Sequence, residues 1–167
     1  MTTNPEFFRN FSQLNEKDIS WLAALLEGEA YFGADYRRRA RLDIQDGYDG
    51  PPPIPFIKLE TIDKDLMDKV ASYVDQTVNP QRRLTSAGKQ VYRITIMARD
   101  KTEVILRRIL PYIGGERTRI KINNLLKMWN DYNEWERGGG RTRAAQRANQ
   151  ARNRARIRNE EQDQENT

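Results

Sequence analysis

The stretch WLAALLEGEAYF, residues 21–32, decides how this chain folds. Its first six residues are all apolar, and they lead directly into Glu27-Gly28-Glu29. Asn15 and Asp18, just before the stretch, resemble a capping box, so the sequence predicts a helix from Asn15 to about Glu27. A helix that is apolar all round must be buried on two sides. One side can face its own domain, and the other needs a second surface.

Composition narrows the chemistry that the chain can perform. Its 167 residues include no cysteine and no histidine. This excludes disulfides, zinc fingers, thiolate nucleophiles and histidine general bases. An enzyme built from this sequence must use carboxylates, lysines, tyrosines or hydroxyls. Carboxylates bind hard cations such as Mg²⁺, Mn²⁺ or Ca²⁺.

Charge and hydropathy indicate where the protein works and on what. The formal net charge is +5, and a basic chain favours a polyanionic partner, most often nucleic acid. Many basic proteins bind no nucleic acid, so local patches matter more than the total. No apolar run approaches the ~20 residues of a membrane span, and the N-terminus lacks the pattern of a secretion signal. We therefore expect an intracellular protein without a membrane partner.

Alternating residues predict the sheet. Residues 36–45, YRRRARLDIQ, have the pattern of a strand with one buried and one polar face. Residues 56–62, 82–86 and 89–97 are typical of further strands, and helical patterns separate and follow the pairs. The order αββαββα, with a final helix, predicts an α+β fold in which helices cover one face of a four-stranded antiparallel sheet. The other face is either an ordinary solvated surface or one that fits a DNA major groove. The residues expected to bind DNA there are Arg37, Arg39, Arg41, Gln45, Lys58, Arg83 and Arg93.

Composition also divides the chain into three parts. We expect residues 1–14 to be an N-terminal arm and residues 15–137 to be the domain. Gly138-Gly139-Gly140 predicts a helix stop and a joint. The segment 138–167 has too few large apolar residues to build a core, so it is expected to be a basic tail, disordered when free. Such a tail either becomes helical on a phosphate backbone or only aids solubility.

Small residues on the first helix suggest what its second surface is. Ala24 and Gly28 are four residues apart, a spacing that lets two helices approach closely. A copy of the same helix, related by a two-fold axis, would supply the missing surface and bring the acidic residues of both chains together. The expected dimer interface consists of Trp21, Ala23, Ala24, Glu27 and Gly28.

Residues 22–30, LAALLEGEA, resemble the signature motif of the LAGLIDADG homing endonucleases. The predicted element order is similar to the αββαββα domain of that family. The stretches LETIDKDLMDKVASYV (59–74) and ILPYIGGERTRIKINNLLKMW (109–129) also look like the family's strand-to-helix junction and closing helix. The similarity covers about residues 14–130.

The resemblance implies a function and a set of roles. One motif in a short chain implies a homodimer that cuts double-stranded DNA at long, rare sites, with Mg²⁺ (or Mn²⁺ or Ca²⁺) at the dimer axis. Glu29 matches the family's metal ligand, and Glu27 matches an acid that supports the helix end. Asp63 matches a position that orders water or metal, and Arg117 lies near a basic position close to the scissile phosphate.

Alternatives remain open at this stage. The chain departs from the motif at Ala24 and Ala30, which replace glycines, and Glu116 stands close to the expected basic position. The second interpretation is a non-cleaving binder on the same fold, such as a splicing maturase for intron RNA or a degenerate DNA-binding protein. An assembly protein that shares only the helix pattern is the third. Glu29, Asp63 and Arg117 have plain structural readings as a solvated carboxylate, a helix cap and an exposed helix residue.

Overall fold

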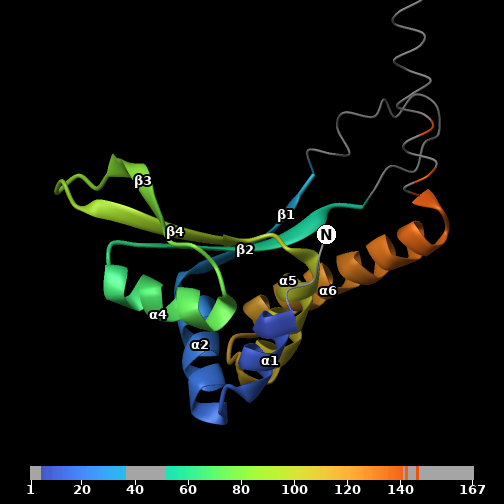
Figure 1. Ribbon diagram of the computed structural model, residues 1–167, viewed down its shortest axis with the longest axis horizontal. Coiled ribbons are helices and arrows are strands. Elements are labelled where there is room, and N and C mark those ends of the chain that lie inside the picture. Colours follow the sequence, from blue (N-terminus) through green and yellow to red (C-terminus); the bar gives the residue numbers. More distant parts are fainter. Residues whose placement is uncertain (1–4, 37–51, 141, 143–145, 147–167) are drawn as a thin grey trace, which may run out of the picture.

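The computed structural model describes residues 5–36, 52–140, 142 and 146. Helices and strands alternate along the chain in a simple order (Figure 1). The elements are α1 (Pro5–Gln13), α2 (Glu16–Glu29), β1 (Ala30–Asp35), β2 (Ile54–Thr61), α4 (Lys64–Val74), β3 (Asn79–Leu84), β4 (Gln90–Ile96), α5 (Arg99–Ile109), the 3-10 turn η2 (Leu110–Tyr112) and α6 (Glu116–Arg137).

The four strands form one sheet in the order β1-β2-β4-β3, and every neighbouring pair is antiparallel. For the described residues, Figure 1 shows the helices gathered on one face of this sheet and none on the opposite face. We call this helix-free side the open face. The prediction of an α+β fold with helices on one face of a four-stranded antiparallel sheet is confirmed.

Alternation along the two central strands separates the two faces. Ile57 and Leu59 of β2 lie opposite Ile96 and Ile94 of β4, and all four side chains are buried in the core. The residues between them project on the open face, where Lys58 lies opposite Thr95 and Glu60 lies opposite Arg93. The period of two in a strand is the cause, since it places neighbouring side chains on opposite sides.

The first strand begins earlier than expected. Asn15 caps α2 by accepting from the Asp18 amide at 2.9 Å, as predicted, but the helix continues through Glu29. The strand β1 then starts at Ala30, with no loop in between. Of the expected strand 36–45, Tyr36 is not in a strand, and the rest lies outside the described residues. The sequence misled because residues 30–35, AYFGAD, show no alternation of polar and apolar residues.

The segment expected to be an arm is part of the domain. Residues 5–13 form α1, which buries Phe7 and Phe11 in the core. The Arg108 guanidinium of α5 donates to the backbone carbonyls of Phe11 and Leu14 and so ties the α1–α2 connection to the domain. The described structure therefore places the boundary of the folded domain before α1 and not at residue 14.

The helix α6 ends where the sequence predicted and packs through two aromatic residues. α6 ends at Arg137 with Gly138 as its C-cap, and it buries Trp129 and Tyr132. In the first turns Ile122 takes the inward position, and Ile120 is 53% exposed. No helix of the described residues is long and apolar enough to cross a membrane.

Candidate functional site

The two carboxylates at the end of α2 have different surroundings. Glu29 is the last residue of the helix, and its side chain is exposed. Ala30 follows with φ −89° and ψ 147°, an extended backbone that any residue adopts. Replacing the motif's last glycine by alanine therefore introduces no backbone strain. Glu29 stands at the point where α2 meets the edge strand β1 of the sheet.

Glu27 faces into the same chain. Its carboxylate accepts hydrogen bonds from the Gly114 amide at 3.0 Å and the Gly115 amide at 2.6 Å. Gly115 is the N-cap of α6 and has no side chain to cap the helix, so Glu27 supplies the negative group that a helix N-terminus favours. A Cβ atom on Gly115 would lie 2.6 Å from the Glu27 Oε1 atom, so an alanine there would displace the carboxylate or the first turn of α6.

This contact brings the first turn of α6 to the end of α2. The first turn carries Arg117, which is exposed, and Arg119, whose Nε atom donates to the Ile113 carbonyl at 2.7 Å. Arg119 thus holds the preceding turn. Arg117 is the one whose side chain projects outward.

Asp63 lies at the same end of the sheet as Glu29. The register pairs Ala30 at the start of β1 with Leu59 near the end of β2, and Asp63 follows shortly after β2. Asp63 is exposed and caps α4 by accepting from the Leu66 amide at 3.0 Å. Its structural role as a helix cap is therefore present in the chain, and a catalytic role remains a prediction.

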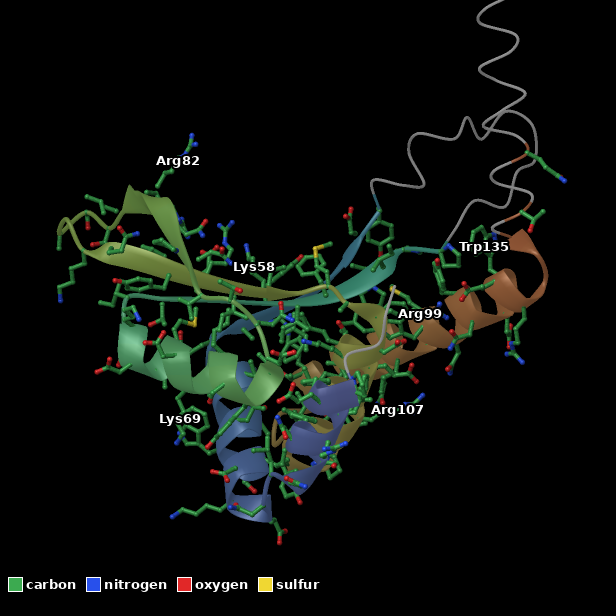
Figure 2. The ribbon with its side chains drawn as sticks, in the orientation of Figure 1. Lys58, Lys69, Arg82, Arg99, Arg107 and Trp135 are labelled. Atoms are coloured by element: carbon green, nitrogen blue, oxygen red, sulfur yellow. The ribbon has the colours of Figure 1, made fainter. Side chains whose placement is uncertain are left out.

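The outer side of α2 carries two of the five residues expected at a dimer interface. Ala24 and Gly28 are exposed, and a Cβ atom added to Gly28 would meet no atom of the described chain within 4 Å. Ala23 is 0% exposed within its own core, which corrects its assignment to the interface. Trp21 is half-buried beside α4, where its ring meets the Tyr73 ring edge-on. The ammonium of Lys69, labelled in Figure 2, lies 4.0 Å from the centroid of the Trp21 ring. Glu27, as described, points to α6.

Three of the predicted DNA-binding residues meet on the open face around one carboxylate. Arg93 donates to Glu60 Oε1 at 2.5 Å, Arg83 pairs with Glu60 Oε2, and the Lys58 ammonium lies 3.6 Å from Oε1. Figure 2 shows Lys58 projecting to the helix-free side of the sheet. We call these four residues the Glu60 cluster. The sequence predicts the three cations of this cluster as DNA-binding residues, but it does not single out Glu60.

The charges in this cluster determine the state of its carboxylate. Burial by itself raises the pKa of Glu60, but the Arg93 hydrogen bond and the charges of Lys58, Arg93 and Arg83 outweigh it. The net effect is a pKa below the ordinary value, so Glu60 is ionised at neutral pH. The cluster therefore combines three cations with one fixed anion.

Other side chains extend the open face. Arg82 projects on the helix-free side (Figure 2) although Arg83 beside it reaches Glu60. A register shift between Pro80 and Leu84 interrupts the alternation here, which is why sequence analysis missed Arg82. Tyr31 is also exposed on this face and lies 5.8 Å from the Lys58 ammonium. The predicted residues Arg37, Arg39, Arg41 and Gln45 lie outside the described residues.

The fit of a divalent cation depends on Glu29. In the described ranges, no group of three or more acidic side chains could hold a metal ion. Glu29 is an exposed carboxylate, the ligand type that Mg²⁺ prefers, but Mg²⁺ takes about six oxygen ligands, often including waters and substrate phosphates. One chain therefore offers one exposed carboxylate here, so a Mg²⁺ ion would need a second carboxylate and phosphate oxygens to complete its coordination.

The chain resembles several solved structures of DNA-bound endonucleases. No family model and no curated protein sequence matches the chain. Among solved structures, the group I intron-encoded homing endonuclease I-CeuI, complexed with DNA, is similar with a TM-score of 0.52 and 14% identity over 74% of this chain and 58% of that one. The homing endonuclease I-CvuI, in complex with the I-CreI target, gives 0.49 and 13% over 72% of this chain and 73% of that one. The meganuclease I-SmaMI, bound to uncleaveable DNA, gives 0.43 and 19% over 74% and 36%.

The likeness to I-CeuI is at the level of the fold. The chain has the fold of the LAGLIDADG homing endonucleases, as the motif at residues 22–30 predicted. It is a fold found in endonucleases that bind DNA. Cleavage, self-association and metal binding by this chain depend on its own residues.

Proposed function

We propose that the chain is a site-specific homing endonuclease of the LAGLIDADG type, which acts as a homodimer on double-stranded DNA. The observation that carries this proposal is the position of Glu29. It is an exposed carboxylate at the end of α2, beside a sheet whose open face carries Lys58, Arg83 and Arg93. A phosphate backbone lying on those cations would run past the carboxylate.

The outer side of α2 supports the homodimer. Ala24 and Gly28 are exposed and small, and no described atom uses the space beside Gly28. A second copy of α2 would fill that space and place its own Glu29 near the first. The two-fold axis would then present one carboxylate from each chain to the two strands of a duplex.

The proposed cofactor is Mg²⁺, with Mn²⁺ or Ca²⁺ as substitutes, held by Glu29 of each chain. When bound, such a cation activates water and neutralises charge on the leaving oxygen of a phosphodiester. Glu29 supplies a ligand oxygen, and α2 holds it at the axis. Arg117 would place positive charge near the scissile phosphate, and Asp63 would orient water while it caps α4.

The open face would select the target. Arginine suits the O6 and N7 acceptors of guanine, and glutamine suits adenine. The residues proposed to contact DNA remain Lys58, Arg83 and Arg93 on the described strands, together with Arg37, Arg39, Arg41 and Gln45. By this proposal the protein works inside the cell as the product of a mobile element such as an intron.

A second candidate is a non-cleaving binder on the same fold, acting on DNA or on intron RNA. Two observations favour it. Arg119 is engaged with Ile113, and the described residues of one chain offer a single exposed carboxylate at the end of α2. Such a protein would retain the open face and the dimer but would not cut.

Cleavage of a partly randomised duplex library in Mg²⁺, followed by sequencing of the ends, tests the proposal. The wild type should yield ends at one family of related sites. Glu29→Gln should bind those sites in Ca²⁺ yet produce no cuts, and Glu16→Gln, at the other end of α2, should cut like the wild type. Equal cutting by Glu29→Gln would overturn the assignment of Glu29. Binding without cutting by the wild type, in Mg²⁺ and in Mn²⁺, would establish the second candidate.

A further inference from the structure

Glu60 is the one acidic side chain at the centre of the Glu60 cluster, and the proposed chemistry gives it no role. We propose that Glu60 is a specificity-determining residue: it fixes Lys58, Arg83 and Arg93 as one array and makes binding depend on base edges more than on phosphates. This inference rests on the proposed function, since it concerns how the open face binds duplex DNA.

The geometry shows that Glu60 organises its neighbours. Its two oxygens are divided between strands, with Oε1 accepting from Arg93 of β4 and Oε2 paired with Arg83 of β3. Lys58 approaches Oε1 from the same strand, at 3.6 Å. One carboxylate in β2 therefore joins cations from all three strands that follow β1 in the sheet.

The positions of these side chains in the sheet make the array rigid. Glu60 lies directly opposite Arg93 in the β2–β4 register, and its side chain is only 19% exposed. The Arg83 side chain is 64% exposed, so of the three cations its conformation depends most on the pairing with Glu60. Long side chains lose rotamer freedom when they bind a partner, and an array fixed before binding reduces that loss.

The chemistry of the carboxylate separates phosphates from bases. A phosphate carries negative charge and only accepts hydrogen bonds, so it is repelled by Glu60 while it is attracted by the cations. The cluster holds three positive charges and one negative charge, which leaves +2. Guanine presents neutral acceptors to the arginines, and the amino group of cytosine can donate to a carboxylate. The ligand class that fits the whole cluster is thus a G·C-containing base edge in the major groove.

Glu60 could instead only stabilise the sheet, and the two roles have different consequences. Partly exposed ion pairs contribute little to stability. A purely structural Glu60 would therefore change thermal stability slightly and leave both the salt dependence of binding and the choice of sequence as they are. A specificity role changes those two properties.

Fluorescence anisotropy with a mixed-sequence duplex over a range of salt concentrations tests the inference. Glu60→Gln removes the repulsive charge and lets the cluster neutralise about one more phosphate. Its plot of log affinity against log salt should be steeper by about 0.9, and at roughly 0.1 M salt it should bind about eightfold tighter than the wild type. Glu103→Gln is the matched control, because Glu103 pairs with Arg107 on α5, away from the open face. The control should match the wild type.

Selection from a randomised duplex pool gives the second measurement. Sites selected by Glu60→Gln should contain fewer preferred G·C positions than sites selected by the wild type. Glu60→Asp keeps the charge but shortens the reach, so it should keep the wild-type salt slope and still lose sequence preference. A Glu60→Gln protein that is folded by circular dichroism but keeps the wild-type slope and preference overturns the inference. A wild type that binds no duplex at low salt overturns the proposed function as well.

Discussion

Glu27 and Glu29 are two identical side chains separated by one glycine, and the molecule uses them in opposite ways. Two residues along a helix are about 200° apart around its axis, so the two carboxylates leave α2 on nearly opposite sides. Glu27 points inward and accepts from the amides of Gly114 and Gly115. Glu29 points outward and is exposed.

The same division runs along the whole helix. The inner side of α2 contains Leu22, Ala23 and Leu26, all buried, while the outer side contains Ala24 and Gly28, both exposed. Its most apolar segment ends on two acids because each acid serves a different side. The inner acid caps α6, and the outer acid is exposed and is the one proposed to act with a partner outside the chain. The following predictions test this division.

The largest effect is expected on the outer side. Ala24→Leu would insert a large side chain where two copies of α2 are proposed to approach. Overpacking typically costs about 1–3 kcal/mol in each chain, so roughly 2–6 kcal/mol for the symmetric pair. The dimer dissociation constant should rise by about thirtyfold or more. Sedimentation equilibrium over a range of protein concentrations measures this change.

The control for Ala24→Leu is Asn123→Leu, which adds the same side chain at an exposed position of α6. It should leave the association unchanged. An Ala24→Leu protein that associates as tightly as the wild type would show that the outer side of α2 is not the interface.

The next effect concerns the inner side. Gly115→Ala would place a Cβ atom 2.6 Å from Glu27 Oε1, so either the carboxylate or the first turn of α6 has to shift. We expect a loss of about 1–3 kcal/mol in the free energy of unfolding, measured by urea denaturation. Gly114→Ala is the matched control, since its Cβ atom would lie 3.8 Å from Glu27 Oε2, an ordinary contact.

The same substitution should become harmless once its partner is removed. In a Glu27→Ala background, Gly115→Ala has no carboxylate to meet, so its destabilisation should largely disappear. A double-mutant cycle measures this coupling. Independent effects of the two substitutions would contradict the contact between the inner acid and α6.

A smaller effect is expected for Glu27→Gln. The amide keeps one acceptor oxygen but turns an NH₂ group toward the second backbone amide, so one of the two hydrogen bonds is lost and the helix N-terminus loses its negative charge. The free energy of unfolding should fall by about 1 kcal/mol. Glu134→Gln, at an exposed position of α6, should change it much less. Equal stability of the two variants would contradict the capping role of Glu27.

How much of this could be predicted from sequence depended on how local the signal was. The N-cap at Asn15, the polar alternation of Lys58 and Arg93, and the stop at Gly138 are local patterns, and the structure confirms each of them. The Glu27 contact joins residues 88 positions apart, as Glu27 and Gly115 are. No local pattern encodes such a contact, and only the resemblance suggested that Glu27 supports a helix end.

One misassigned residue and one overlooked residue both depend on how the elements pack. Ala23 and Ala24 are neighbouring alanines of identical chemistry, and only the phase of α2 against the core buries one and exposes the other. Glu60 was missed because its partners come from different strands and meet only once the sheet forms. Sequence patterns therefore indicated which residue types would gather on each face, while the pairing within a face required the register.

An effect on stability no larger than that of Glu27→Gln separates two roles of Asp63, which caps α4 and is also proposed to act near Glu29. Asparagine is as good an N-cap as aspartate but carries no charge, whereas alanine cannot cap. Asp63→Ala should therefore lower the free energy of unfolding by about 1 kcal/mol, and Asp63→Asn should leave it nearly unchanged. If the charge also serves cleavage, Asp63→Asn should slow the cutting of the selected site about tenfold, a loss of about 1.4 kcal/mol in transition-state stabilisation. An Asp63→Asn protein that melts and cuts like the wild type would assign Asp63 to capping α4 alone and leave Glu29 as the proposed catalytic carboxylate.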